Sequence, residues 1–384
     1  MMINRVILNE TSYFGRGARE KLVDEIKSRN FRKALIVTDK SLISAGVPQL
    51  VLEVLDKNDI EYEIYDEVKP NPTVTNVKDG LNICKNSLAD FLIAIGGGSV
   101  IDTAKAIGII MTNSEYSDVV SLDGVVNTKN KALPIIALPT TAGTAAEVTI
   151  NYVITDEVRV KKMVCVDPHD IPIVAIIDPD LMQSMPKSLA AATGMDALTH
   201  AMEGYITKAA WLIPDIFHIN AMALIYKNLA KAVNLKDNYA IEQVGYGQYI
   251  AGMGFSNVGL GIAHSMAHSL GAFFDTPHGV ANAIILPTVM EYNAPATGEK
   301  YRDIAKAMGV KGTDDMTQEE YRKAAVDAVR KLSQDVGIPA NLKDIVKEED
   351  IPFLAQSAYD DACRPGNPRE TSVEEITKLY ESLI

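Results

Sequence analysis

The feature that most constrains the fold is an alternation of short apolar runs with amphipathic segments over about the first 180 residues. The apolar runs are rich in β-branched residues, and each is followed by a turn signal such as Asp39-Lys40 or Gly96-Gly97-Gly98. This alternation is typical of β-α-β units, whose strands form a parallel sheet. The clearest predicted strands are residues 34–38, 91–95, 133–138 and 173–177.

Beyond about residue 185 the short β-type runs disappear, and apolar residues recur with the period of an α-helix. Thr317 and Glu320 have the spacing of a capping box and are predicted to open a helix. Thr371 and Glu374 are predicted to open the last helix in the same way. The sequence therefore predicts an α/β N-terminal domain, residues 1–183, and an all-α C-terminal domain, residues 184–384.

Composition excludes several classes of protein. The 384 residues carry 50 acidic and 37 basic side chains, a formal charge of -13 that repels phosphate backbones and anionic membrane surfaces. We therefore expect no nucleic acid and no membrane as partner. The three cysteines, Cys84, Cys165 and Cys363, lie far apart, which argues against disulfides and a thiolate zinc site and suits a cytoplasmic protein.

Two segments could be mistaken for membrane or export signals. The apolar run at the N-terminus breaks too early for a secretory signal. Residues 243–274 carry no charged side chain, but glycines and polar residues interrupt them, whereas a lipid-spanning helix needs about 20 predominantly apolar residues. We expect this segment to form tightly packed interior helices.

A glycine-rich turn follows the predicted strand at residues 91–95 and leads into a helix. Gly97 and Gly98 let the backbone approach a pyrophosphate, and the N–H groups at the start of the helix favour its negative charge. The alternative is an ordinary helix start, with Ser99 as its N-cap and Asp102 three residues later.

Two further segments lie at the same predicted edge of the sheet. Asp39 follows a strand end, where a carboxylate can accept from a ribose 2'-hydroxyl and repel a 2'-phosphate. Residues 139–147 follow another strand and contain Thr140, Thr141 and Thr144. Each could be a plain turn or cap, but together with the glycine-rich turn they predict a dinucleotide site at the carboxyl edge of the sheet.

The C-terminal half contains a set of metal-binding side chains at helical spacing. Asp196 and His200 lie four residues apart, as do His264 and His268, and His278 follows shortly after. A single buried histidine is commonly a core residue, but several with a carboxylate predict a site for a divalent ion, Fe²⁺ or Zn²⁺ first, with Mn²⁺, Co²⁺ and Ni²⁺ also compatible with these ligand types. With no thiolate ligand, such an ion is a strong Lewis acid that can polarise a carbonyl.

These residues and the surrounding motifs resemble the iron-containing (group III) alcohol dehydrogenases. The resemblance runs from residues 4–11 to residues 367–370, and residues 14–18 and 251–257 are further strong matches. It implies the fold shared by dehydroquinate synthase and iron-type alcohol dehydrogenases, with an NAD-binding and a metal-binding domain. Ser269 departs from the family pattern, which often has proline there, and removes no ligand.

The resemblance also implies roles for individual residues. It assigns the metal, Fe²⁺ with Zn²⁺ as a possible substitute, to Asp196, His200, His264 and His278. His268 is implied to lie near the substrate as a catalytic residue that does not bind the metal. The implied NAD-binding residues are Asp39, Asn71, Gly97, Gly98, Ser99, Asp102, Thr140, Thr141, Thr144, Asn151 and Lys162.

The implied activity is the NAD-dependent reduction of lactaldehyde to 1,2-propanediol and its reverse, in a cleft between the domains of a homodimer. Other short alcohols, including 1,3-propanediol, ethanol and butanol, are alternative substrates. A lyase such as dehydroquinate synthase is a rival within enzymes, although the uninterrupted loop at residues 140–147 disfavours it. A metal-binding NADH sensor without turnover is the alternative outside enzymes.

Overall fold

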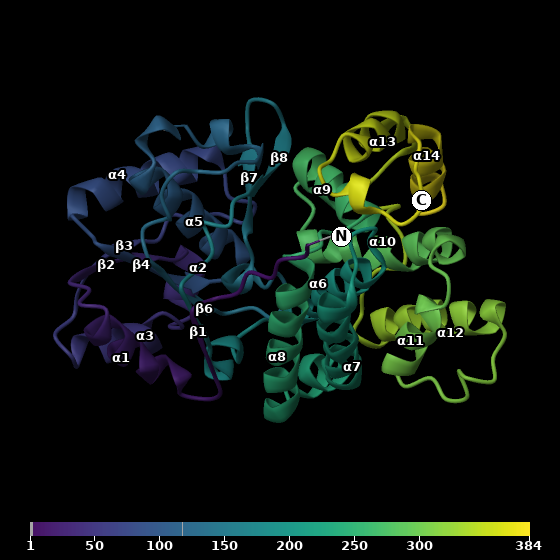
Figure 1. Ribbon diagram of the computed structural model, residues 1–384, viewed down its shortest axis with the longest axis horizontal. Coiled ribbons are helices and arrows are strands. Elements are labelled where there is room, and N and C mark those ends of the chain that lie inside the picture. Colours follow the sequence, from purple (N-terminus) through teal and green to yellow (C-terminus); the bar gives the residue numbers. More distant parts are fainter. Residues whose placement is uncertain (1–2, 117) are drawn as a thin grey trace. The chain divides into compact units, whose positions relative to one another are not determined.

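The computed structural model describes residues 3–116 and 118–384, and the chain divides into two compact units after Met185. All strands of the described residues belong to the first unit, whereas the described part of the second unit, from Pro186 onward, contains only helices and loops (Figure 1). The predicted fold class, an α/β half followed by an all-α half, is confirmed.

The first unit is built on a six-stranded sheet in which every strand pairing is parallel. In spatial order the strands are β1 (Thr11–Phe14), β9 (Val174–Ile177), β6 (Ile135–Pro139), β4 (Phe91–Gly96), β2 (Lys33–Val37) and β3 (Glu61–Tyr65). Four of them are the predicted strands, displaced by at most two residues at either end.

Helices cover both faces of this sheet. Along β4, Leu92 and Ala94 belong to one apolar cluster, while Ile93 and Ile95 belong to another, as the two-residue period of a strand requires. The first cluster includes residues of α4 (Val74–Ser87) and α5 (Gly98–Thr112); the second includes residues of α1 (Lys21–Ser28) and α3 (Gln49–Asp56). A short helix, α2 (Lys40–Ser44), follows β2.

A smaller sheet consists of β5 (Gly124–Val125), β8 (Lys161–Val166) and β7 (Asn151–Asp156). The fully buried Lys105 of α5 ties the segment before β7 to that helix, because its ammonium donates to the Thr149 carbonyl at 2.7 Å and the Asn151 carbonyl at 2.9 Å. Its counter-charge is the equally buried Asp170, 3.9 Å away. Lys105 thus connects α5, the helix that follows the glycine-rich turn, to the chain entering β7.

The second unit consists of helices packed on one another. They are α6 (Lys187–Ile206), α7 (Leu212–Leu235), α8 (Asn238–Phe255), α9 (Ile262–Phe274), α10 (His278–Asn293), α11 (Lys300–Ala307), α12 (Gln318–Asp335), α13 (Ile351–Tyr359) and α14 (Val373–Glu381). The charge-free segment 243–274 forms most of α8 and all of α9. None of the helices in the described residues combines the length and apolarity needed to cross a bilayer.

Two glycines show how closely these helices pack. A Cβ added to Gly204 of α6 or Gly254 of α8 would lie 2.4 Å and 2.2 Å, respectively, from Nε2 of His218 on α7. Only glycine leaves room for this fully buried ring, so His218 joins three helices of the core.

One predicted helix cap is confirmed and one is wrong by a residue. Thr317 and Glu320 form the capping box that opens α12. Helix α14 is instead opened by Ser372 and Glu375, each of which accepts a hydrogen bond from the backbone N–H of the other. Thr371 is buried, and its hydroxyl donates to the carbonyl of Arg369, so it is not available as the cap.

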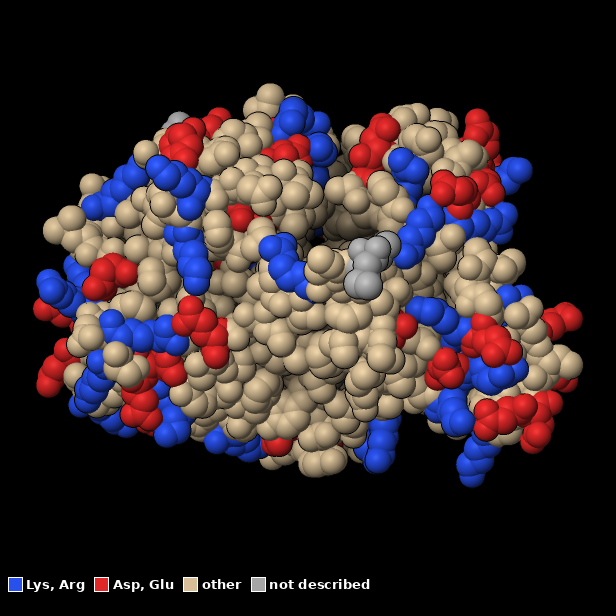
Figure 2. Space-filling model, in the orientation of Figure 1, with Lys and Arg blue, Asp and Glu red and all other residues tan. Residues whose placement is uncertain are grey.

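The surface drawn in Figure 2 bears charges of both signs. On the face drawn in Figure 2, the described acidic and basic side chains are interspersed, and no continuous basic area is seen among them.

Candidate active site

Four predicted metal-binding residues converge inside the second unit. Asp196 and His200 lie on α6, His264 on α9, and His278 is the first residue of α10. One donor atom from each lies within 4.8 Å of the others. From the Asp196 carboxylate, the nearest nitrogens of His278, His200 and His264 are 3.7, 3.9 and 4.0 Å away.

These separations are close to those of a metal site. Ligand atoms bonded to a tetrahedral ion at about 2.0–2.2 Å lie roughly 3.3–3.6 Å from one another. The distances from Asp196 exceed this range by only a few tenths of an ångström, and the other pairs of donor atoms lie within 4.8 Å of one another. The donor set, one carboxylate and three imidazoles, fits a borderline divalent cation.

The site is buried, and two of its nitrogens have no hydrogen-bond partner. Asp196 is 1% exposed and His264 1% exposed. Nδ1 of His200 and Nε2 of His264 find no partner among residues 3–116 and 118–384. Burial lowers the pKa of His200 to about 3 and that of His264 well below its usual value, so both rings are neutral at neutral pH and can offer a lone pair. Such orphaned nitrogens beside a buried carboxylate fit a bound cation.

Glu203 fixes the orientation of His264 and was not foreseen from the sequence. Its carboxylate accepts from Nδ1 of His264 at 2.6 Å, and from the backbone N–H groups of Gly261 and Ala263 at 3.1 and 2.7 Å. One side chain thus caps the start of α9 and turns the other ring nitrogen of His264 toward Asp196. Burial raises the pKa of Glu203 to about 7. Its place on α6, one turn after His200, is the sequence signal that could have identified it.

Two other side chains position the donors. The side-chain nitrogen of Asn282 on α10 donates to the Asp196 carboxylate at 2.7 Å. The same nitrogen lies 3.1 Å from Nε2 of His278, which precedes Asn282 by one helical turn. The ring of Phe255 stacks on His200, with 4.2 Å between the centroids and 15° between the planes. The contacts of Asn282 with Asp196 and of Phe255 with His200 do not follow from local spacing, whereas Asn282 and His278 lie four residues apart on one helix.

His268 lies beside the four donors and is engaged elsewhere. Its ring stacks on that of His278, with centroids 5.2 Å apart, and its Nδ1 lies 2.9 Å from the carboxylate of Asp361. Asp361, 93 residues away in sequence, is a second functional candidate that the sequence did not indicate.

In the first unit, the glycine-rich turn and the threonine loop lie against each other. A Cβ on Gly98 would come within 2.7 Å of the Thr144 side chain, and one on Gly97 within 3.2 Å of Thr141. The two loops leave the neighbouring strands β4 and β6, which pair through Gly96 and Pro139. Glycine at these two positions lets the threonine loop pack directly against the start of α5.

The alternative interpretation of Ser99 and Asp102 as a helix cap is wrong. Helix α5 begins at Gly98, its N-cap is Gly97, and no side chain caps it. The Asp102 carboxylate instead accepts from the backbone N–H of Val153 in β7 at 3.0 Å. The first N–H groups of α5 are therefore not bonded by a capping side chain, as an anion site requires.

Three further cofactor candidates, Asp39, Asn71 and Lys162, each form a hydrogen bond within the first unit. Asp39 follows β2 and is the N-cap of α2, accepting from the N–H of Leu42 at 2.9 Å. Lys162 donates to the Asn71 side chain at 2.6 Å, which joins two candidates 91 residues apart. Asp39 thus has the capping role of a turn aspartate in addition to any role toward a ribose.

The class of protein is that of a metal-dependent dehydrogenase, with a glycine-rich strand-to-helix turn on a parallel sheet and a buried set of one aspartate and three histidines. Comparisons with known proteins identify the family. The profile described as iron-containing alcohol dehydrogenase matches residues 9–179, and the one described as the C-terminal part of the Fe-containing alcohol dehydrogenase family matches residues 190–384. The chain belongs to the iron-containing alcohol dehydrogenases and is an oxidoreductase.

Individual relatives agree over the whole length. Lactaldehyde reductase of Escherichia coli K12 is 60% identical over 382 residues, which cover 99% of this chain and 100% of the relative. The structure of an alcohol dehydrogenase from Oenococcus oeni superposes with a TM-score of 0.96 at 38% identity, covering 100% of both chains. A sulfoacetaldehyde reductase from Bifidobacterium kashiwanohense, solved in complex with NAD⁺, has a TM-score of 0.88 at 29% identity, covering 100% of this chain and 99% of its own.

The buried neutral histidines make a prediction about pH. After a chelator has removed divalent ions, the protein should lose stability as the pH falls below about 6.5, because the unfolded chain then binds protons that His200 and His264 cannot bind when folded. Each buried ring, His218 included, contributes up to about 1.4 kcal/mol per pH unit, whereas Glu203, whose pKa burial raises to about 7, and Asp102, raised to about 6, contribute with the opposite sign, so the contribution of one ring is the difference between its variant and the unaltered chain. Urea unfolding at several pH values between about 7 and 5 measures this slope.

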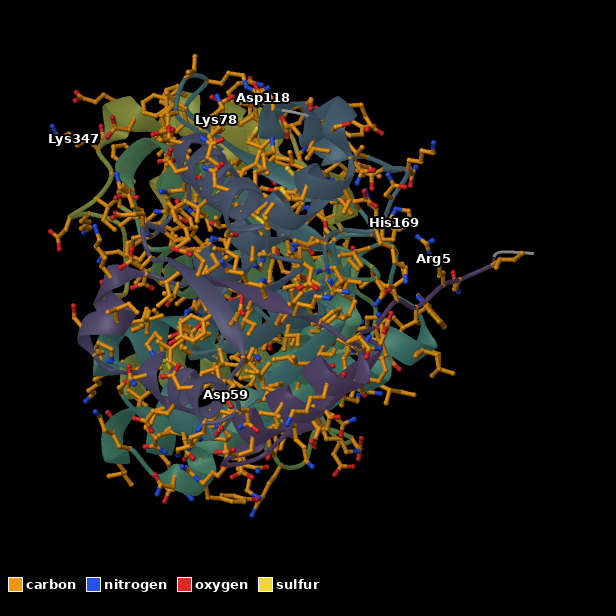
Figure 3. The ribbon with its side chains drawn as sticks, turned by 90° about the vertical axis from the view of Figure 1, so that its left-hand side faces the viewer. Arg5, Asp59, Lys78, Asp118, His169 and Lys347 are labelled. Atoms are coloured by element: carbon orange, nitrogen blue, oxygen red, sulfur yellow. The ribbon has the colours of Figure 1, made fainter. Side chains whose placement is uncertain are left out.

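Two substitutions provide the controls. His200→Gln should flatten the dependence, whereas His169→Gln should not, because His169, labelled in Figure 3, belongs to the first unit and has a side chain that is 37% exposed. A slope in His200→Gln equal to that of the unaltered chain would show that the His200 ring is not buried as described.

Proposed function

We propose that the chain catalyses the NAD-dependent reduction of lactaldehyde to 1,2-propanediol and the reverse reaction. The observation that carries the proposal is the convergence of Asp196, His200, His264 and His278, in a chain 60% identical to a lactaldehyde reductase over its whole length. The first unit is the NAD-binding domain and the second the metal-binding catalytic domain. The homodimer and the cytoplasmic location remain predictions.

Fe²⁺ is the proposed resident ion, held by the four donors, with Zn²⁺ as a possible substitute. Nitrogen and oxygen donors suit both ions, and the name of the family favours iron. Bound there, the ion would supply Lewis acidity toward the carbonyl oxygen while NADH supplies a hydride to the carbonyl carbon, so aldehyde, NADH and one proton give alcohol and NAD⁺.

NAD is the proposed cofactor, and the first unit supplies the features that support it. The uncapped start of α5 offers backbone N–H groups to a pyrophosphate, and Gly97 and Gly98 bring the hydroxyls of Thr141 and Thr144 close to it. The carboxylate of Asp39 would meet the ribose 2'-hydroxyl. The other proposed contacts are Asn71, Ser99, Asp102, Thr140, Thr141, Thr144, Asn151 and Lys162.

His268 is the proposed catalytic residue for proton transfer. Asp361 accepts from Nδ1 of His268, which fixes the ring and its tautomer and leaves Nε2 to exchange a proton with the substrate oxygen or a water. The stacked position beside His278 keeps His268 next to the four donors without making it one of them.

One assay tests the proposal. The metal-loaded protein should oxidise NADH with lactaldehyde, with a higher kcat/KM than with acetaldehyde, butyraldehyde or 3-hydroxypropionaldehyde. A higher kcat/KM for one of the other aldehydes would identify that aldehyde, and the short alcohol formed from it, as the preferred substrate pair. NADH binding without turnover of any of them would favour the sensor.

The metal site gives the second prediction. Glu203→Gln should weaken Fe²⁺ or Zn²⁺ binding by roughly 10- to 100-fold, because a neutral amide replaces the carboxylate that accepts the hydrogen bond from Nδ1 of His264. Competition with a chelator of known affinity measures the change. Glu319→Gln, on the exposed surface of α12, is the matched control and should bind as the unaltered chain does. Equal metal affinities of the Glu203→Gln and Glu319→Gln variants would show that Glu203 does not contribute to metal binding.

The cofactor site gives the third prediction. Asp39 should favour NADH over NADPH by about 2 to 4 kcal/mol, through a hydrogen bond to the 2'-hydroxyl and repulsion of the 2'-phosphate. Asp39→Gly should relax this preference, and Asp39→Asn should also relax it while keeping a good cap for α2. The ratio of kcat/KM for the two cofactors is the measurement. Efficient use of NADPH by the unaltered chain would contradict the role of Asp39.

The catalytic residue gives the fourth prediction. His268→Ala should keep the metal and the affinity for NADH but lower kcat by about 10²-fold, at the low end of acid–base contributions. Metal content, NADH binding and kcat are measured on one preparation. Loss of the metal would show that His268 is a ligand, and an unchanged kcat would show that it is a packing residue.

A further inference from the structure

A second group of potential ligands lies beside the four-donor set in the second unit. It consists of His268 on α9 and of Asp361 and Cys363, which follow α13, and one donor atom from each lies within 4.8 Å of the others. Two hydrogen bonds hold the group together. Asp361 accepts from Nδ1 of His268 at 2.9 Å and from the backbone N–H of Cys363 at 2.8 Å.

The chemistry of this group differs from that of the four donors. It contains a thiol, whereas the first set has only nitrogen and oxygen donors, and the other two cysteines, Cys84 and Cys165, belong to the first unit. Thiolate, imidazole and carboxylate together are a ligand set for Zn²⁺ and for other thiophilic ions.

We propose that His268, Asp361 and Cys363 form a second, inhibitory metal site that binds Zn²⁺ in preference to Fe²⁺. A tetrahedral zinc ion bound at about 2.0–2.3 Å needs donor atoms roughly 3.3–3.8 Å apart, and the donor atoms of this group, all within 4.8 Å of one another, need at most about an ångström of adjustment. Water would complete the coordination, as in other zinc sites with three protein ligands.

The group can be reached and can contract. As whole residues Asp361 and Cys363 are partly exposed, although the Asp361 side chain is only 8% exposed, and both lie in the segment between α13 and α14, outside both helices. Binding releases the thiol proton to solvent, and the His268–Asp361 hydrogen bond is replaced by bonds from both side chains to the ion, with the imidazole proton on the other ring nitrogen.

Inhibition follows because the ion occupies the imidazole assigned to proton transfer. This consequence rests on the proposed function, whereas the binding itself does not. Zinc in excess of the first site should therefore inhibit, and a chelator that removes only the weaker ion should restore activity.

Cobalt(II) tests the site without relying on turnover. A cobalt ion bound to sulfur gives a thiolate-to-metal charge-transfer band in the near ultraviolet, and the four-donor set cannot produce it. The full-length protein titrated with Co²⁺ should bind two ions per chain and develop this band. Cys363→Ser should bind one ion and lack the band, whereas Cys84→Ser, a buried thiol of the first unit, should behave as the unaltered chain does. His264→Ala should keep the band.

Activity measurements separate the two proposals. With the first site filled by zinc, Cys363→Ser should keep its turnover and raise the zinc concentration for half-inhibition by at least about tenfold. A single cobalt ion per chain without the band, a band that persists in Cys363→Ser, or unchanged zinc inhibition in that variant would each overturn the second site. The band with no lactaldehyde reduction would instead support the second site and overturn the proposed function.

Discussion

The second unit depends on the burial of one carboxylate among three imidazoles. Asp196 is almost wholly removed from solvent, and removing a carboxylate from water costs several kcal/mol unless a partner compensates it. Burial lowers the pKa values of His200 and His264, so these two neighbouring rings are neutral and supply no counter-charge. A divalent cation among the four donors would supply it. The requirement to place these donors in one interior position constrains α6, α9 and α10 together.

Glu203 links this site to the architecture of the unit. The carboxylate that turns His264 toward Asp196 also bonds to the backbone N–H groups that open α9, so the path of the helix and the direction of the ligand are fixed by one group. In the first unit Lys105 has a comparable role, since it joins α5 to the chain entering β7. In each unit, one buried charged residue thus hydrogen-bonds to the backbone of a neighbouring segment: Glu203 joins α6 to the start of α9, and Lys105 joins α5 to the start of β7.

The sequence predicts features that arise from local spacing. The central strands, the glycine-rich turn and the pairs Asp196–His200 and His264–His268 follow from periods of two and of 3.6 residues. Contacts between distant segments are not predicted: Glu203 and His264 are 61 residues apart, His268 and Asp361 are 93 apart, and β1 pairs with β9 across the first unit. The misplaced cap of α14 is a smaller case, since burial of Thr371 leaves the role to Ser372.

The most direct test of the account is an anomalous-scattering crystal structure of the active, iron-loaded protein. The account predicts a peak bonded to the Asp196 carboxylate and to one nitrogen each of His200, His264 and His278, with no sulfur ligand. A crystal of active protein with no anomalous peak among these four side chains would contradict it.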